Sequence, residues 1–178
     1  DMNVVICSAF RNAGHLIDNY FNQIDALANL LAKRGDWLSL VLGYGDSEDG
    51  TGEMLFEASA DSIGARLVEV SHGGQSFGSV VNAQRFKQLA YIGNKILANV
   101  PDDADAVIWL ESDLIWAPEV IAELLNHLQW HACVAPMIMD SNGATWYDTW
   151  AFRRRGICFV KQPPYHACMM TGDHMIEM

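Results

Sequence analysis

Residues 106–113 have the sequence AVIWLESD, in which a continuous apolar run ends in two carboxylates, Glu111 and Asp113. An uninterrupted apolar run is typical of a strand covered on both faces, as in a parallel sheet. While the chain stays extended, side chains two residues apart point to the same face. Both carboxylates could then bind one hard divalent ion, Mg²⁺ or Mn²⁺, shared with a substrate diphosphate. Two carboxylates that cap the following helix are the competing interpretation.

Strand and helix patterns alternate along the rest of the chain. Further apolar runs predict strands over Met2–Ala9, Trp37–Tyr44, Arg66–Val70 and His131–Met139. Apolar residues at helical spacing predict helices over about residues 15–33, 51–63, 79–99 and 118–129, and Gly35 is expected to end the first of them. The irregular C-terminal segment adds short strands around residues 146–152 and 156–160. The alternation predicts an α/β fold, with a mainly parallel sheet flanked by helices.

The composition excludes several classes of protein. The chain has 178 residues, 51% of them hydrophobic, so we expect a single domain over residues 1–178. It has 11 Lys and Arg against 22 Asp and Glu, a net charge of -11, which disfavours a non-specific nucleic-acid binder. No apolar stretch is long enough to span a membrane, and the first residues lack a basic region, so no signal peptide is expected. The four cysteines form no CxxC pair, so a structural zinc site is unsupported and a cytoplasmic protein with reduced thiols is expected.

Candidate binding residues follow the predicted strands, because ligands of open parallel sheets bind outside the carboxyl ends of the strands. After the first strand, the backbone around Ser8, Phe10 and Arg11, with the face of Phe10, is a candidate nucleotide site; an ordinary loop is the alternative. Asp46 follows the second strand and belongs to the same predicted edge. Arg85, on the long predicted helix, is a candidate partner for a phosphate, and a solvated helix face is the alternative.

Other local patterns narrow the chemistry. Asp49 or Thr51 is expected to cap the second helix, and Asp49 is the preferred candidate. The glycine-rich stretch at residues 73–78 lacks the Gly-Lys-Ser/Thr of a P-loop, and no GxGxxG follows the first strand, so ATPase and dinucleotide oxidoreductase activities are unsupported. Arg153–Arg155 fits an anionic partner or a charged surface turn. His174 lies in the polar C-terminal part, where a third metal ligand could arise, although such a histidine is more often an ordinary side chain.

Several of these segments resemble those of one enzyme family. Ser47–Thr51 (SEDGT), residues 84–97 and residues 106–113 resemble the SxDGT segment, the long helix and the DxD strand of nucleotide-sugar glycosyltransferases with the GT-A fold. Residues 147–153 (YDTWAFR) are similar to the YDTxAxR segment of fungal capsule-associated mannosyltransferases, and residues 107–136 are similar to fungal mannan polymerase subunits. Residues 171–174 resemble the acidic motif that supplies a base in family 2 enzymes. The likeness extends over roughly residues 2 to 155.

The resemblance implies a Rossmann-like GT-A transferase that uses a GDP- or UDP-sugar together with Mn²⁺ or Mg²⁺. Carried over to this sequence, Asp113 would bind the metal, and Glu111 would contact the metal or the ribose. Arg85 and Asn94 would support the nucleotide. Mannose as the donor sugar is implied by family likeness alone.

The resemblance also implies roles near the acceptor. Asp148 would lie close to the sugar or the acceptor. An inverting enzyme needs a general base, for which Asp148 and Asp173 are the candidates, whereas a retaining enzyme needs no dedicated base. The acceptor could be a glycan, a lipid-linked sugar, a protein or a modified nucleic-acid base. Family members continue past this point with acceptor-binding elements, so we expect either a minimal or truncated domain or an acceptor site that a partner completes. An oligomer is a separate expectation.

Two rival functions remain at this point. A nucleotidyltransferase would use a related sheet and paired carboxylates, but this chain lacks the Gly-rich basic loop that such enzymes place after their first strand. A non-catalytic nucleotide-binding scaffold of the same fold is the second rival. Three departures from the family pattern favour the scaffold, because Tyr44, Gly45 and Gly93 replace an acidic pair and an arginine.

Overall fold

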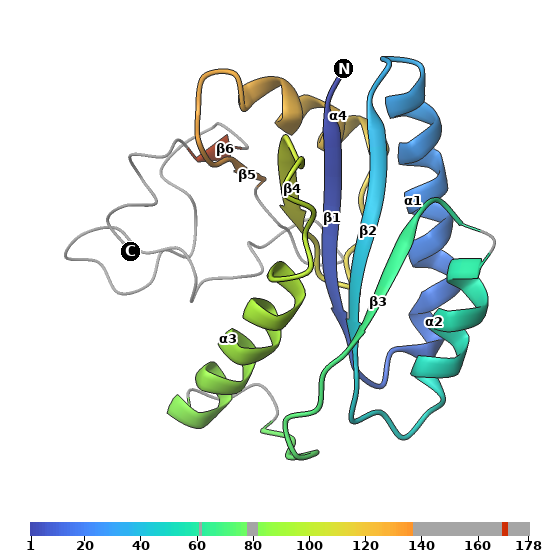
Figure 1. Ribbon diagram of the computed structural model, residues 1–178, viewed down its shortest axis with the longest axis vertical. Helices are drawn as coiled ribbons and strands as arrows, with labels where there is room; N and C mark the ends of the chain where they lie inside the picture. Colours follow the sequence, from blue (N-terminus) through green and yellow to red (C-terminus); the bar gives the residue numbers. More distant parts are fainter. Residues whose placement is uncertain (61, 78–81, 137–168, 171–178) are drawn as a thin grey trace, which may run out of the picture. The chain divides into compact units, whose positions relative to one another are not determined.

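The computed structural model describes residues 1–60, 62–77, 82–136 and 169–170. It divides into two compact units, Asp1–Glu119 and Val120–Met178, which are described separately below. The elements of the first unit are β1 (Asn3–Phe10), the 3-10 turn η1 (Gly14–Leu16), α1 (Ile17–Ala32), β2 (Trp37–Tyr44), α2 (Thr51–Ala60), β3 (Ala65–Glu69), α3 (Ala83–Leu97) and β4 (Ala106–Trp109) (Figure 1). Helix α4 (Pro118–His127) leads into the second unit, where β5 (Ala135–Pro136) pairs antiparallel with β6 (Met169–Met170).

The first unit is built on a four-stranded sheet in the order β3-β2-β1-β4, and every neighbouring pair is parallel. The register places Phe10 beside Tyr44 and Tyr44 beside Glu69, so these strands end at the same edge. The predicted α/β fold with a mainly parallel sheet is therefore confirmed. Its carboxyl edge is the place where the loops that follow β1, β2 and β3 come together.

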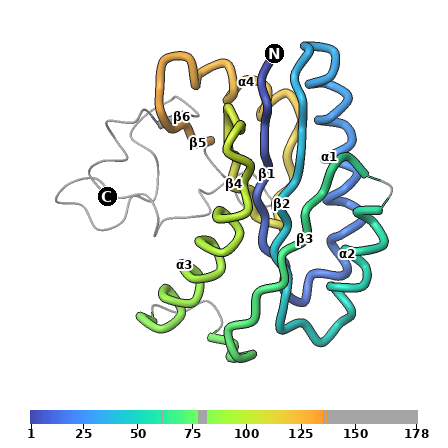
Figure 2. The backbone as a smooth tube through the Cα atoms, in the orientation of Figure 1, coloured from blue at the N-terminus to red at the C-terminus, as the bar shows by residue number. Residues whose placement is uncertain are grey.

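The two faces of β1 contact different helices. Ser8 and Phe10 face α1, since the Ser8 hydroxyl is 2.7 Å from the hydroxyl of Tyr20 and the Phe10 ring packs on the Tyr20 ring. Val5 and Cys7, on the opposite face, form a buried cluster with Ile96 of α3. Figure 2 shows α1 and α2 side by side along the sheet, apart from α3. The sheet thus has helices on both faces, which is why β1 is apolar almost throughout.

Two glycines have distinct roles in this unit, one in a close approach and one in a backbone turn. A Cβ atom on Gly43 of β2 would overlap the side chain of Ile96, so the glycine lets α3 pack directly on the strand. Gly35 has a φ of +82°, a conformation that side chains other than glycine rarely adopt, and it lies just beyond the end of α1. The predicted role of Gly35 as the stop of the first helix is confirmed.

Several predicted boundaries shift in the structure. The long helix begins at Ala83 rather than near residue 79, because the Asn82 side chain accepts hydrogen bonds from the backbone N–H groups of Gln84 and Arg85 and acts as its N-cap. Helix α2 ends at Ala60 rather than at residue 63. Of the predicted strand over His131–Met139, the structure assigns residues 135–136, and residues 137–139 lie outside the described part. The short strands expected at residues 146–152 and 156–160 also lie outside it.

The prediction for β4 was wrong in one respect. The apolar run was expected to be covered on both faces, yet Val107 is 46% exposed and Trp109 is 41% exposed. Both lie on the face that β1 turns toward α3, because Val107 pairs with Val5 and Trp109 pairs with Cys7. An apolar sequence shows that a strand can be buried, but the length and placement of the neighbouring helix determine how much of the strand is covered.

In the described ranges, no helix combines the length and the apolar composition that crossing a bilayer requires.

Candidate nucleotide-binding cavity

A cavity of about 650 Å³ opens at the carboxyl edge of the sheet. Its walls come from the ends of β1, β2 and β4, from the loop after β3 and from one side of α3. The lining residues are Ala9, Phe10, Arg11, Gly43, Tyr44, Gly45, Val70, His72, Gln75, Ser76, Phe77, Arg85, Gln88, Leu89, Ala90, Ile92, Gly93, Asn94, Leu97, Trp109, Glu111 and Ser112. The volume lies within the range of small-ligand sites, and the lining mixes aromatic rings with a few charged groups.

The loops after β1 and β2 are joined by reciprocal hydrogen bonds from the SEDGT segment. The Ser47 hydroxyl accepts from the backbone N–H of Asn12 at 3.1 Å, and the Asn12 side chain accepts from the N–H of Glu48 at 2.8 Å. The Thr51 hydroxyl accepts from the N–H of Ala13 at 2.9 Å. The segment therefore uses its polar atoms to fix the first loop of the cavity.

Asp49 completes this joint between the loops. Its carboxylate accepts hydrogen bonds from the N–H of Thr51 at 3.1 Å and from the N–H of Gly14 at 3.0 Å, and the Thr51 hydroxyl also donates to it. These bonds hold the pKa of Asp49 below its ordinary value, with the Thr51 hydroxyl as the largest cause. The Asp49 carboxylate thus accepts from the first N–H group of α2, and the bond to Gly14 adds a tie to η1.

Asp46 holds the loop that follows β3. It has a φ of +51°, and its carboxylate accepts from the Ser71 hydroxyl and from the backbone N–H of His72, both at 2.7 Å. Those two bonds, the His72 N–H first, lower the pKa of Asp46. Asp46 was predicted to bind the cofactor, but it is not among the residues that line the cavity. The structure gives it the task of shaping the cavity wall.

Arg11 fixes the same loop from the other side. Its guanidinium donates to the carbonyl oxygen of Gln75 at 3.0 Å and to that of Gly74. It also lies 3.1 Å from Nε2 of His72. A guanidinium can only donate, so a hydrogen bond between these two groups requires Nε2 to accept. Arg11 lines the cavity as predicted, with its charge directed to the wall.

Ser8 and Phe10, at the end of β1, pack against Tyr20 of α1. Ser8 is fully buried with its hydroxyl on Tyr20, and it does not line the cavity. Phe10 lines the cavity, but the residue is only 3% exposed and its ring meets the Tyr20 ring edge-on, with centroids 5.0 Å apart. The open Phe10 face expected from the sequence is therefore absent, because the ring is used in the core.

The carboxylate motif leaves β4 in a turn. The strand ends at Trp109, and the N–H of Leu114 approaches the carbonyl oxygen of Glu111 at 3.4 Å. The premise of an extended chain through Glu111 and Asp113 was therefore wrong. Glu111 lines the cavity and accepts a 2.9 Å hydrogen bond from the indole N–H of Trp109, whereas Asp113 is exposed and does not line the cavity.

Helix α1 anchors the chain just beyond this turn. The Gln23 side chain donates to the carbonyl oxygen of Leu114 at 3.3 Å and accepts from the N–H of Trp116 at 2.7 Å.

Within the described residues, no group of three or more His, Cys, Asp or Glu side chains gathers as a metal site. The predicted residues Asp148, Asp173 and His174 lie outside the described part.

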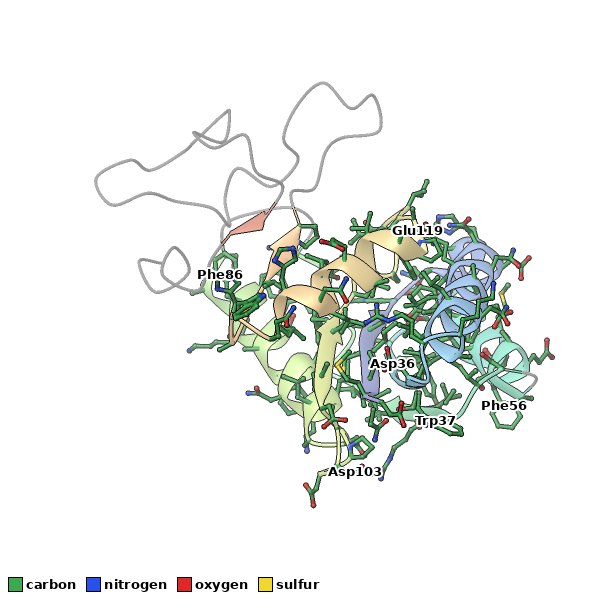
Figure 3. The ribbon with its side chains drawn as sticks, turned by 90° about the horizontal axis from the view of Figure 1, so that it is seen from above. Asp36, Trp37, Phe56, Phe86, Asp103 and Glu119 are labelled. Atoms are coloured by element: carbon green, nitrogen blue, oxygen red, sulfur yellow. The ribbon has the colours of Figure 1, made fainter. Side chains whose placement is uncertain are left out.

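Helix α3 supplies the opposite wall. Arg85 lies in its first turn and Asn94 near its other end, and both line the cavity, as the sequence suggested. Phe86, labelled in Figure 3, lies 5.9 Å below the Arg85 guanidinium. Gly93 faces the ring of Trp109, since a Cβ atom there would lie 3.8 Å from Cη2 of the indole. The sequence interpretation missed Trp109 and His72 as wall residues; the position of Trp109 two residues before Glu111 was the available signal.

A family comparison identifies the chain. The family model described as cryptococcal mannosyltransferase 1 matches residues 3–174. The chain belongs to this family. Membership in the cryptococcal mannosyltransferase 1 family agrees with the resemblance found in the sequence. A comparison with the curated proteins gave no match.

Among solved structures, a mannosyltransferase from Pyrobaculum calidifontis, determined in complex with GDP-mannose and Mn²⁺, is similar to this family member. The two share 19% sequence identity with a TM-score of 0.53. The match covers 70% of this chain and 32% of the other, so the chain spans about a third of the length of its neighbour. At this identity the match shows the fold, which is that of the GT-A glycosyltransferases.

Proposed function

We propose that the chain is the donor-binding part of a nucleotide-sugar glycosyltransferase, and that its donor is GDP-mannose. The observation that carries the proposal is the cavity at the carboxyl edge of the sheet. There Arg85, Asn94 and Glu111 gather from elements that are far apart in the sequence. Family membership and the GT-A fold support the same activity. The mannose and guanine specificities rest on the family and on the ligand of the solved neighbour.

The charges of the cavity suit a diphosphate that arrives with a cation. Arg85 can donate to phosphate oxygens from the first turn of α3. Glu111 and Asp113 present carboxylate oxygens, the ligands that Mn²⁺ and Mg²⁺ accept, at the turn after β4. Glu111 lines the cavity and Asp113 follows it in the same turn outside the lining, so Glu111 alone, or both if Asp113 turns inward, would bind a cation whose remaining ligands are phosphate oxygens and water.

In this proposal each side chain has a definite task. A cation held by Glu111 and Asp113 would supply charge neutralisation to the departing diphosphate. Arg85 would orient the diphosphate, and Asn94 would hydrogen-bond the nucleotide. Asp148 and Asp173 remain the candidate bases if the transfer inverts. The acceptor hydroxyl comes from a glycan, a lipid-linked sugar, a protein or a modified nucleic-acid base.

A donor screen tests the proposal. The protein is incubated with Mn²⁺ and GDP-mannose, GDP-glucose, UDP-glucose or UDP-N-acetylglucosamine, and released nucleoside diphosphate is measured with and without simple glycan acceptors. We expect GDP release from GDP-mannose and none after chelation of the metal. Asp113→Ala should lower that release by about a hundredfold, the scale seen when a group that stabilises developing charge is removed. Asp102→Ala, which removes an exposed carboxylate that does not line the cavity, is the matched control.

Other outcomes would contradict the proposal. Release of pyrophosphate would indicate a nucleotidyltransferase. Metal-independent nucleotide binding without turnover of any donor would indicate a scaffold. Turnover that is the same in Asp113→Ala and in the wild type would remove Asp113 from the metal site.

A further inference from the structure

Trp109 is an exposed aromatic residue inside the cavity. It is the last residue of β4, it pairs with Cys7 of β1, and it is 41% exposed. Its register places it on the face of the sheet that α3 covers. Gly93 of the helix has no side chain to cover the indole; a Cβ atom there would lie 3.8 Å from Cη2 of the ring. A large apolar ring is thus left open within the binding cavity.

The indole is joined to the carboxylate that the function requires. Its Nε1–H donates to Oε1 of Glu111 at 2.9 Å. An indole nitrogen is a donor only, so the bond satisfies Trp109 and fixes one oxygen of Glu111 beside the ring. The second oxygen, Oε2, is not engaged by the indole. The cavity therefore holds an apolar ring face and a carboxylate acceptor next to each other.

This pairing matches the chemistry of a sugar ring. A sugar presents C–H groups on its faces and hydroxyl donors at its rim, so an aromatic face and an adjacent carboxylate recognise both parts together. We propose that Trp109 contacts a sugar ring of the bound nucleotide sugar and positions Glu111 to accept a hydrogen bond from a hydroxyl of that ring. The inference rests on the proposed function. The sugar is either the ribose of the nucleotide or the hexose that is transferred.

Two substitutions separate the ring from its N–H group. Trp109→Phe keeps an aromatic face and removes the donor to Glu111, whereas Trp109→Leu removes both. Trp37→Phe is the matched control: Trp37 is 74% exposed at the start of β2 (Figure 3), and it does not line the cavity. Circular dichroism and thermal melting establish that each variant is folded.

Binding is measured by calorimetry with GDP and with GDP-mannose in the presence of Mn²⁺, and by quenching of tryptophan fluorescence. We expect Trp109→Leu to weaken binding about tenfold and Trp109→Phe about threefold, because stacking accounts for part of the contact and the placement of Glu111 for the rest. Quenching on ligand addition should be largely lost in Trp109→Phe and retained in Trp37→Phe. If Trp109 had a structural role alone, the quenching would come from the other tryptophans and would persist in Trp109→Phe.

The two ligands distinguish the sources of the sugar. Equal loss for GDP and GDP-mannose assigns the contact to the ribose, and loss for GDP-mannose alone assigns it to the hexose. Unchanged affinities in Trp109→Phe and Trp109→Leu, or unchanged quenching in Trp109→Phe, overturn the inference while the proposed function stands. If Trp109→Leu fails to fold, Trp109→Phe decides between these results. A wild-type protein that binds neither ligand overturns the proposed function and this inference with it.

Discussion

Asp49 shows how a polar residue in a family-like motif can act on the backbone. Its carboxylate accepts from the N–H groups of Gly14 and Thr51, and the Thr51 hydroxyl donates to it. These bonds favour the ionised carboxylate and lower its pKa in the folded protein. The residue therefore couples the stability of two cavity loops to pH.

The sign of this coupling leads to a prediction for Asp49→Asn. A carboxylate whose pKa is lower in the folded protein than its unfolded value of about 3.9 contributes stability that is complete above about pH 5. The contribution is lost as the pH falls through the lower folded value. Asp49→Asn should melt at a lower temperature than the wild type at pH 7, and its melting temperature should fall less steeply below pH 5.

Thermal melts by circular dichroism between pH 3 and pH 7 measure this difference. Glu57→Gln, which removes an exposed carboxylate from α2, is the control and should keep the acid dependence of the wild type. An Asp49→Asn protein with the same acid dependence as the wild type would show that the Asp49 hydrogen bonds do not stabilise the fold.

The candidate site could be predicted from sequence in its location but only in part in its contacts. The placement of Glu111 and Arg85 at the cavity could be predicted, because strand ends and helices are visible as sequence patterns. The hydrogen bonds of Arg11 could not be predicted, since its partners lie more than 60 residues away in the loop after β3. The burial of Ser8 was hidden for the same reason: its partner, Tyr20, belongs to a helix whose orientation the sequence does not specify.

Helix α3 approaches the sheet through Gly43 of β2. A Cβ atom at that position would overlap the Ile96 side chain, which is fully buried against Val5, Cys7 and Val41. Close-packed cores do not accept added atoms without a shift of side chains or backbone. The same helix carries Arg85 and Asn94 into the cavity wall, so its distance from the sheet also sets the width of the site.

Gly43→Ala should therefore destabilise the protein by about 1–3 kcal/mol, the usual cost of overpacking a core. Ile96→Val removes the δ-methyl group that the new atom would meet, and alone it should cost about 1 kcal/mol. The double variant should be more stable than the sum of the two losses implies, because the deletion makes room for the insertion. Urea denaturation of the four proteins in a double-mutant cycle measures the coupling, and strictly additive losses would contradict the packing described here.

The elements themselves were predictable where local patterns decide them. Strand β2 has the bounds expected from its apolar run, and α1 ends before Gly35, whose positive φ marks the stop. Strand β4 was expected to be covered on both faces, but the covering depends on how far α3 extends across Trp109. Local sequence specifies the alternation of strands and helices, whereas the fit between layers is a tertiary property.

At the scale of the whole molecule, the net charge of -11 opposes the approach of a nucleoside diphosphate. Inside the cavity, Arg85 can donate to the anion once it has entered, and Arg11 adds positive charge to the wall. The two effects act over different distances: the net charge acts through solvent and is screened within about 10 Å at 0.1 M salt, while contacts in the cavity are screened less. Salt should therefore affect the rate of entry differently from the stability of the complex.

We expect the association rate of GDP without divalent metal to rise as NaCl increases from about 10 mM to about 150 mM, over which the screening length shortens from about 30 Å to about 8 Å. The dissociation rate, set by contacts inside the cavity, should change less. With Mn²⁺ present the ligand carries less negative charge, so the salt dependence of association should become weaker. Stopped-flow fluorescence gives both rates. An association rate that falls with salt would mean that Arg11 and Arg85 dominate the field felt by the incoming nucleotide, and the acidic excess would then have no influence on binding.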